Sequence, residues 1–419
     1  MKKILQESYK KLMIEHKVFI IFTLLFLTAI FALENFNQRF WLHDFKVYYL
    51  AAKALVEGTP VYGVAFGLST GFYKYSPFTL LLFTPSLLFD FYTAIVIQFF
   101  VITITTVVTF LLIQKIINSY LLNTTLLNIN IVLLIALLCV FRHLFRELHL
   151  GNLNMIIVCL LSLGLLFTLK SKYILSGIFI GMVVLIKPYF LLLMLPFLIY
   201  GKVKTIVSTG LTVIISIIVS FGILGFTKGL SLYQEWLNSM IAHGTYLVSY
   251  ETIFSLLKSY LFPNIPNIFQ VVIILLVTIL YLLFFLQLKK EANNNQNKVE
   301  LNNKSFIIGF FILLSIIPNL LLTDTEHFLF TLPLILYIMN NLFINKNKVE
   351  ITVFVIFILL YAAFSSDILG NVFTDKIDSL GMLGLGNLCL IGFSLYLLFK
   401  NQNTLINNKQ IQKKAIENS

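Results

Sequence analysis

Long apolar runs constrain this chain more than any other feature of its sequence. Of 419 residues, 59% are hydrophobic and only 11% are charged, and the mean hydropathy is +0.93. Soluble domains do not have this composition, whereas a membrane-spanning helix needs about 20 mostly apolar residues. The runs predict an all-α, polytopic integral membrane protein. We expect about twelve transmembrane helices, at residues 18–34, 91–114, 127–142, 152–170, 173–186, 189–201, 205–226, 267–288, 305–322, 328–344, 350–366 and 382–399.

Lysines gather in the connectors between alternate runs, and they predict the orientation. Positively charged connectors stay on the cytoplasmic side of a membrane. With these connectors inside, both termini are cytoplasmic, and the Ile-, Asn- and Lys-rich usage indicates a bacterial cytoplasmic membrane. The short run at 76–90 has two prolines and would reverse the later connectors if it crossed, so we expect it to lie on the outer surface or to re-enter.

The same threading divides the chain into four parts. Outer loops at 35–90 and 227–266 belong to the first part, and the Asn-rich stretch EANNNQNKVELNNK is expected to be a linker without a fold of its own. The expected parts are an N-terminal transmembrane module (1–288), a cytoplasmic linker (289–304), C-terminal transmembrane helices (305–399) and a cytoplasmic tail (400–419).

Ionisable side chains from separate connectors fall on the outer side of this topology. Such groups are costly at a membrane boundary, so a one-sided collection of them predicts a functional site, here that of a membrane-embedded enzyme. The three cysteines have no metal-binding spacing, and we expect neither a metal nor another cofactor. The collection comprises Asp44, Arg142, Arg146, Glu147, His149, Lys187, Glu235, His243, Glu251, Asp324, Glu326 and His327.

The first outer loop begins with a predicted helix from Asp44 to about Glu57. Aromatic and small residues follow a helical spacing, and Gly58 supplies the stop. Asp44 has two interpretations, a helix cap or a general base that takes the proton of an attacking sugar hydroxyl. The two roles are compatible.

Several blocks of the sequence resemble glycosyltransferase family 87. The first outer loop reads D-F-K-V-Y-Y-x-A-A-K-A-L-x-x-G-x-P-x-Y from Asp44 and then F-Y-K-Y-S-P-F. Further blocks are G-N-L-N (151–154), where the family usually has Gln in place of Asn152, S-G-I-F-I-G-M-V-V-L-I-K-P (176–188) and P-N-L-L-L-T-D-T-E-H-F (318–328).

This resemblance implies a GT-C-type membrane fold with a helical first outer loop, and an enzyme that uses polyprenyl-phosphate sugars. It also implies that Asp44, the first acid of that loop, is the catalytic base. Lys187, Arg146, Arg142 and His327 are the expected ligands of the donor phosphate, because cations stabilise a leaving phosphate and arginine matches its geometry. The expected substrate-binding residues are Tyr48, Tyr49, Tyr75, His149, Asn152 and Glu326.

Each of these roles has a plainer alternative. Lys187 could reach the lipid headgroups, Arg146 could pair with Glu147, and the tyrosines could form an interfacial belt. Asn154 starts a helix, where capping is its expected role. The compact Asp324, Glu326 and His327 set is too small to supply a metal site by itself.

We therefore expect an inverting transfer of a mannose-like hexose or arabinose to a glycan or lipid acceptor at the outer face. The expected partners are the polyprenyl-phosphate donor, the acceptor and the bilayer, and no nucleic acid. The alternatives are a lipid-linked sugar flippase or transporter, and another lipid-linked glycan polymerase or ligase. A transporter would place ionisable residues at mid-membrane on broken helices, and only Lys187-Pro188 offers this.

Overall fold

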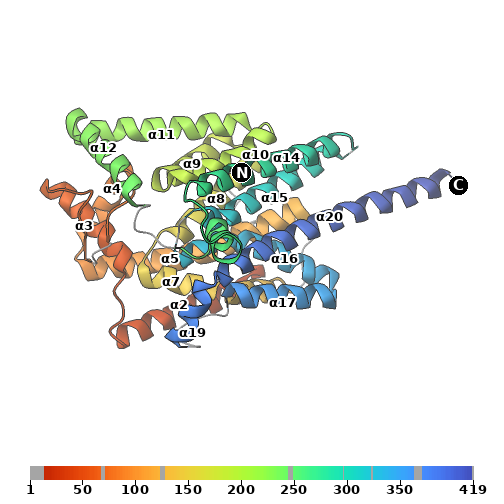
Figure 1. Ribbon diagram of the computed structural model, residues 1–419, viewed down its shortest axis with the longest axis horizontal. Coiled ribbons are helices and arrows are strands. Elements are labelled where there is room, and N and C mark those ends of the chain that lie inside the picture. The colour runs from red at the N-terminus through yellow and green to blue at the C-terminus, as the bar shows by residue number, and fades with distance from the viewer. Residues whose placement is uncertain are drawn as a thin grey trace.

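The protein is a bundle of helices lying along one long axis (Figure 1). The computed structural model describes residues 14–67, 71–122, 128–243, 249–295, 297–321, 324–362 and 370–417. Within these ranges the only β contact is an isolated bridge between Ala65 and Phe72. The predicted all-α class is confirmed.

Among the described residues, seven helical segments are long and apolar enough to cross a membrane. An eighth span is counted if α6 (Ile129–Cys139) and α7 (Phe141–Leu150), which bend by 64° at their junction, are taken together. The seven are α2 (Lys17–Phe36), α5 (Phe91–Ile116) with η2 (Ile117–Leu122), α11 (Val203–Leu224), α14 (Phe269–Asn293), α15 (Lys298–Leu320), η4 (Thr325–Thr331) with α16 (Leu332–Asn345), and Met382–Lys400 of α20 (Met382–Glu417).

Three of the other four expected spans are shorter helices and the fourth is described only in part, so the count of about twelve is not confirmed. The three are α8 (Asn154–Leu169), α9 (Tyr173–Ile186), and η3 (Pro188–Leu193) with α10 (Met194–Ile199). The fourth is α17 (Lys348–Ala362), and residues 363–366 of that expected span lie outside the described residues. Hydropathy marks an apolar run but does not distinguish a span from a short helix that other helices enclose.

The break at Lys187-Pro188 is real. Helix α9 ends at Ile186, Lys187 has extended backbone angles (φ −137°, ψ 97°), and Pro188 begins η3. Proline lacks the N–H that would continue the α9 ladder. The two apolar runs are therefore separate segments rather than one continuous helix.

Small residues let α9 approach α11 closely. A Cβ on Gly177 would lie 2.3 Å from the side chain of Ser208, and one on Gly181 would lie 2.7 Å from that of Thr212. Glycines four residues apart share one face of a helix, an arrangement that membrane helices use for close packing. This contact holds α9, and hence Lys187 at its end, tightly against α11.

The segment predicted as the first outer loop is helical, as expected. It contains α3 (His43–Glu57), which ends at Gly58 with φ +75°, followed by α4 (Pro77–Phe83) and η1 (Thr84–Leu88). The Ser76 side chain accepts from the Thr79 N–H and caps α4. In Figure 1 these helices lie at the left end with α12 (Phe226–His243), and α20 leaves the bundle at the opposite end.

The expected linker is largely helical. Helix α14 continues to Asn293 and α15 begins at Lys298, so the prediction that residues 291–304 have no fold of their own was wrong. Side chains one turn apart support each helix, as in the 2.9 Å ion pair between Lys304 and Glu300. The prediction rested on the asparagine-rich composition and did not take these side-chain pairs within one helix into account.

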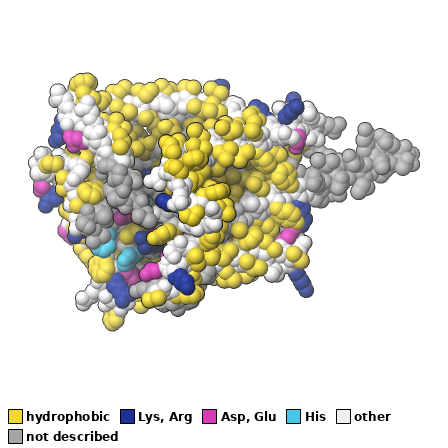
Figure 2. Space-filling view, in the orientation of Figure 1, with side chains coloured by type: hydrophobic (Ala, Val, Ile, Leu, Met, Phe, Trp, Pro, Cys, Tyr) yellow, Lys and Arg dark blue, Asp and Glu magenta, His cyan; other side chains and the backbone are white. Residues whose placement is uncertain are grey.

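On the face that Figure 2 shows, hydrophobic side chains cover the middle of the molecule and charged side chains gather toward its two ends. Helices α11 and α14 are exposed over most of their apolar length. An apolar belt between two polar ends is what a bilayer requires of a protein that crosses it. The chain is a multi-pass membrane protein.

Candidate active site

The turn between α7 and α8 lies against the start of α3. Gly151 ends α7 with φ +69°, and a Cβ at this position would lie 2.9 Å from the Cβ of Phe45. Only glycine combines this backbone conformation with such close approach. The turn brings Asn152 next to Asp44, although 108 residues separate them in the chain.

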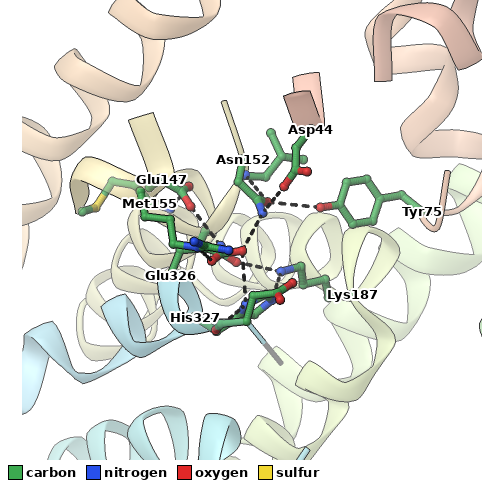
Figure 3. A network of polar contacts seen from close by, with 12 residues as sticks. Asp44, Tyr75, Glu147, Asn152, Met155, Lys187, Glu326 and His327 are labelled. Atoms are coloured by element: carbon green, nitrogen blue, oxygen red, sulfur yellow. Dashed lines mark hydrogen bonds and ion pairs between the residues drawn. The ribbon is translucent and has the colours of Figure 1, made fainter. Parts of the chain in front are cut away.

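Asn152 is the centre of the polar network in Figure 3. Its Nδ2 donates to Asp44 Oδ2 at 2.7 Å and to Glu326 Oε1 at 3.3 Å. Its Oδ1 accepts from the N–H of the next residue at 2.7 Å and lies 3.3 Å and 3.4 Å from the hydroxyls of Tyr48 and Tyr75, which bond to each other at 2.9 Å. One hydroxyl donates to the other, which leaves one O–H to donate to Oδ1. These donors fix Oδ1 and direct the amide nitrogen at the two carboxylates.

Asp44 lies half-buried in the first turn of α3. The N-cap residue is Leu42 with a left-handed backbone, and Asp44 caps nothing, so the capping interpretation was wrong. Burial raises the pKa of Asp44 above that of an ordinary aspartate, Lys74 opposes this, and Asp324 adds to it. A carboxylate with a raised pKa is a stronger base when ionised.

Arg146 forms an ion pair with Glu326. Its Nε donates to Glu326 Oε2 at 3.0 Å, and its side chain is 52% exposed while that of Glu326 is 1% exposed. The alternative pairing of Arg146 with Glu147 is absent from the described contacts, because Glu147 faces the protein interior. Glu326 therefore holds the guanidinium by one edge and leaves the rest of this cation at the surface.

Lys187 and His327 meet directly. Lys187 Nζ lies 2.7 Å from Asn154 Oδ1 and 2.7 Å from His327 Nε2, and His327 Nδ1 lies 3.2 Å from the carbonyl oxygen of Asp324. An ammonium group has no acceptor, so Nε2 accepts and the proton of the neutral ring is on Nδ1, which donates to the carbonyl. These contacts fix the positions of the Lys187 ammonium group and the His327 ring.

Glu147 caps α8 from the neighbouring helix. Its Oε1 accepts from the Met155 N–H and its Oε2 from Asn154 Nδ2, both at 2.9 Å. Asn154 therefore bridges Glu147 and Lys187, and its predicted capping role was wrong. A carboxylate near a helix N-terminus satisfies free N–H groups and complements the helix dipole.

Three predicted site residues have partners outside this network. Arg142 Nη2 lies 3.4 Å from Asp378 on α19 (Asn371–Ser379), His149 Nδ1 lies 3.2 Å from Glu34, and the Tyr49 hydroxyl donates to the carbonyl oxygen of Phe89 at 3.0 Å. Arg142 lies one turn before Arg146 on α7, and the two arginines pair with different acids. The structure thus brings together eight of the eleven predicted residues: Asp44, Tyr48, Tyr75, Arg146, Asn152, Lys187, Glu326 and His327.

Glu147, Asn154, Lys74 and Asp324 were not among the predicted ligands. Glu147 and Asn154 flank the L-H-L-G-N-L turn. An acid shortly before the start of a predicted helix was the available sequence signal. Lys74 gave none beyond its place between two tyrosines. Within the part of the chain that the structure describes, no group of three or more His, Cys, Asp or Glu side chains could hold a metal ion.

The family model of glycosyltransferase family 87 matches residues 72–315, more than half of the chain. The matched range contains Arg146, Asn152 and Lys187; Asp44 precedes it, and Glu326 and His327 follow it. No curated protein is significantly similar to the chain.

Proposed function

The chain belongs to glycosyltransferase family 87, and from this premise we propose that it transfers a sugar from a polyprenyl-phosphate donor to a glycan or lipid acceptor. The proposed site is the network around Asp44, at the outer face of a bacterial cytoplasmic membrane. The sugar is a mannose-like hexose or arabinose. Both termini are cytoplasmic in this proposal, which rests on the lysine-rich connectors.

One observation carries the proposal: a half-buried carboxylate lies in a network of polar contacts with two cations on a membrane scaffold. Asp44 connects through Asn152 to Glu326, which binds Arg146. Lys187 bonds to His327, whose Nδ1 lies 3.9 Å from Glu326 Oε1. Glycosyl transfer needs a base for the acceptor hydroxyl and positive charge for the leaving group. A donor anchored by a lipid suits a site reached from the bilayer.

The reaction proceeds by in-line displacement. As the acceptor oxygen forms its bond to the anomeric carbon, ionised Asp44 takes the hydroxyl proton. The bond from the anomeric carbon to the phosphate oxygen breaks, and its electron pair leaves with polyprenyl phosphate. The configuration at the anomeric carbon inverts. Asp44, being half-buried, returns its proton to solvent.

Lys187 and Arg146 stabilise the departing phosphate. The Nζ of Lys187 has two neighbours, Asn154 and His327, and an ammonium has three donors, so one N–H can point to the phosphate. The surface-facing edge of Arg146 supplies further donors. Arg142 has no part in this step because Asp378 pairs with it.

The test is transfer by the purified protein in nanodiscs. Short-chain polyprenyl-phosphate mannose and arabinose are supplied with extracted membrane glycolipids as acceptors, and product configuration is read by NMR. We expect a product of inverted configuration, and a loss of about 10²–10⁴-fold in Asp44→Asn. Asp378→Asn, at an acid outside the network, is the control and should stay within a few-fold of the wild type.

Undiminished transfer by Asp44→Asn would remove Asp44 as the base, and a retained configuration would exclude single displacement. A flippase would instead move labelled donor across the bilayer without cleaving it, and Asp44→Asn would leave the sugar–phosphate bond intact as in the wild type.

A further inference from the structure

The hydroxyl of Tyr189 is buried and has no hydrogen-bond partner among the described residues. A buried hydroxyl without a partner costs free energy, because it has given up water and received nothing in exchange. Phenylalanine would fill the same space without this penalty. The hydroxyl therefore needs an explanation beyond packing.

Its place in the fold offers one. Tyr189 is the second residue of η3, two positions after Lys187, and its ring packs on Phe190 with a centroid distance of 4.8 Å. The hydroxyl lies within electrostatic range of the Tyr75 hydroxyl and the Glu326 carboxylate, both members of the network around Asn152. The unpartnered O–H thus borders the proposed donor site.

We propose that Tyr189 is a substrate-binding residue whose phenol O–H donates to an oxygen of the donor head group, on the sugar or on the phosphate. The inference rests on the proposed function, since that function supplies the ligand. Both kinds of oxygen accept a hydrogen bond. Bound donor would give the hydroxyl the partner that the protein alone does not provide.

The experiment compares Tyr189→Phe with Tyr281→Phe. Tyr281 on α14 is the matched control, because its hydroxyl is also buried and without a partner among the described residues, and it packs instead against Phe285 and Gly309. Each variant is measured for kcat/KM with polyprenyl-phosphate sugar. The rise in unfolding temperature is measured on adding either that donor or polyprenyl phosphate alone.

Both variants should unfold at the wild-type temperature or slightly above it, since each loses an unsatisfied group. Only Tyr189→Phe should lose kcat/KM, by about tenfold, the scale of one hydrogen bond. If its reduced stabilisation appears with the sugar donor alone, the partner is a sugar oxygen. If it appears with polyprenyl phosphate as well, the partner is a phosphate oxygen.

Unchanged kcat/KM and unchanged stabilisation by both lipids in Tyr189→Phe would overturn the inference, while wild-type transfer would leave the proposed function standing. If the wild type transfers no sugar from any donor, the proposed function fails instead. The stabilisation measurement then decides the inference, which is lost if neither lipid stabilises the wild type more than Tyr189→Phe.

Discussion

Replacing Asn152 with leucine should move the pH dependence of the reaction. The change keeps a side chain of similar size and removes the amide that donates to Asp44 at 2.7 Å and to Glu326 at 3.3 Å. The hydroxyls of Tyr48 and Tyr75 remain bonded to each other at 2.9 Å, although one of them loses Asn152 Oδ1 as its acceptor. The two carboxylates lose the donor that they share.

The size of the effect follows from the bond to Asp44. A hydrogen bond to a charged group contributes about 1.5–3 kcal/mol, and each pKa unit corresponds to about 1.4 kcal/mol. Losing a donor that favours the ionised form raises the pKa of Asp44 further, by about one to two units. Since the ionised form is the base, activity is lost as pH falls through this pKa, and the acid limb of kcat/KM moves to higher pH by the same amount.

The assay is kcat/KM against pH for the wild type, Asn152→Leu and Asn387→Leu. Asn387 is an equally buried amide with three hydrogen-bond partners, Ser315, Asn319 and Thr331, none of them in the Asp44 network. Asn387→Leu should lose stability and keep the wild-type acid limb. An acid limb that stays in place in Asn152→Leu, or moves equally in both variants, would refute the assignment of Asn152 to Asp44.

Three further predictions concern the supports of the site. Gly151→Ala should lower the free energy of unfolding by about 2 kcal/mol or more and remove most of the activity, because φ is +69° and the new Cβ meets Phe45. Unfolding in detergent measures the first loss and the transfer assay measures the second. A variant with wild-type stability and activity would contradict the turn geometry. Arg146→Gln should lower kcat/KM at least tenfold while Arg142→Gln stays within about threefold, and equal losses would return Arg142 to the site. Glu251 is buried and accepts from the Gly384 N–H; burial raises its pKa to about 7, so the folded state retains the proton longer than the unfolded state and stability falls as pH rises from about 4.5 to 7. Glu251→Gln should abolish up to about 3 kcal/mol of this pH-dependent loss of stability, measured by urea or thermal unfolding between pH 4.5 and 7. A variant whose unfolding free energy changes with pH as in the wild type would contradict this assignment.

Local sequence features predicted the local structure well. The helix from His43 to Glu57, its glycine stop and the break at Lys187-Pro188 depend on neighbouring residues, because capping and proline chemistry act within one turn. The wrong predictions concern side chains whose partners lie far away in the sequence. Asp44 looks like a cap in sequence, and whether a carboxylate caps its own helix or receives an amide from another depends on a partner 108 residues away.

The same division holds for the site. Arg142 and Arg146 are equivalent in sequence, one turn apart on one short helix, yet α19 supplies Asp378 to the first and η4 supplies Glu326 to the second. Tyr189 had no sequence signal at all, because an unpartnered hydroxyl is a property of its surroundings. Pairings of this kind depend on which helices pack together.

Hydropathy, basic connectors and helix signals were enough to determine an all-helical membrane protein with its ionisable residues drawn from a few connectors, since these are sums over neighbouring residues in one solvent environment. Tertiary packing alone decided that Asn152 joins Asp44 to Glu326, that Lys187 meets His327, and which apolar runs form helices shorter than a span. These contacts bring distant segments within about 3 Å of each other, a separation that hydrogen bonding demands and that no local pattern encodes.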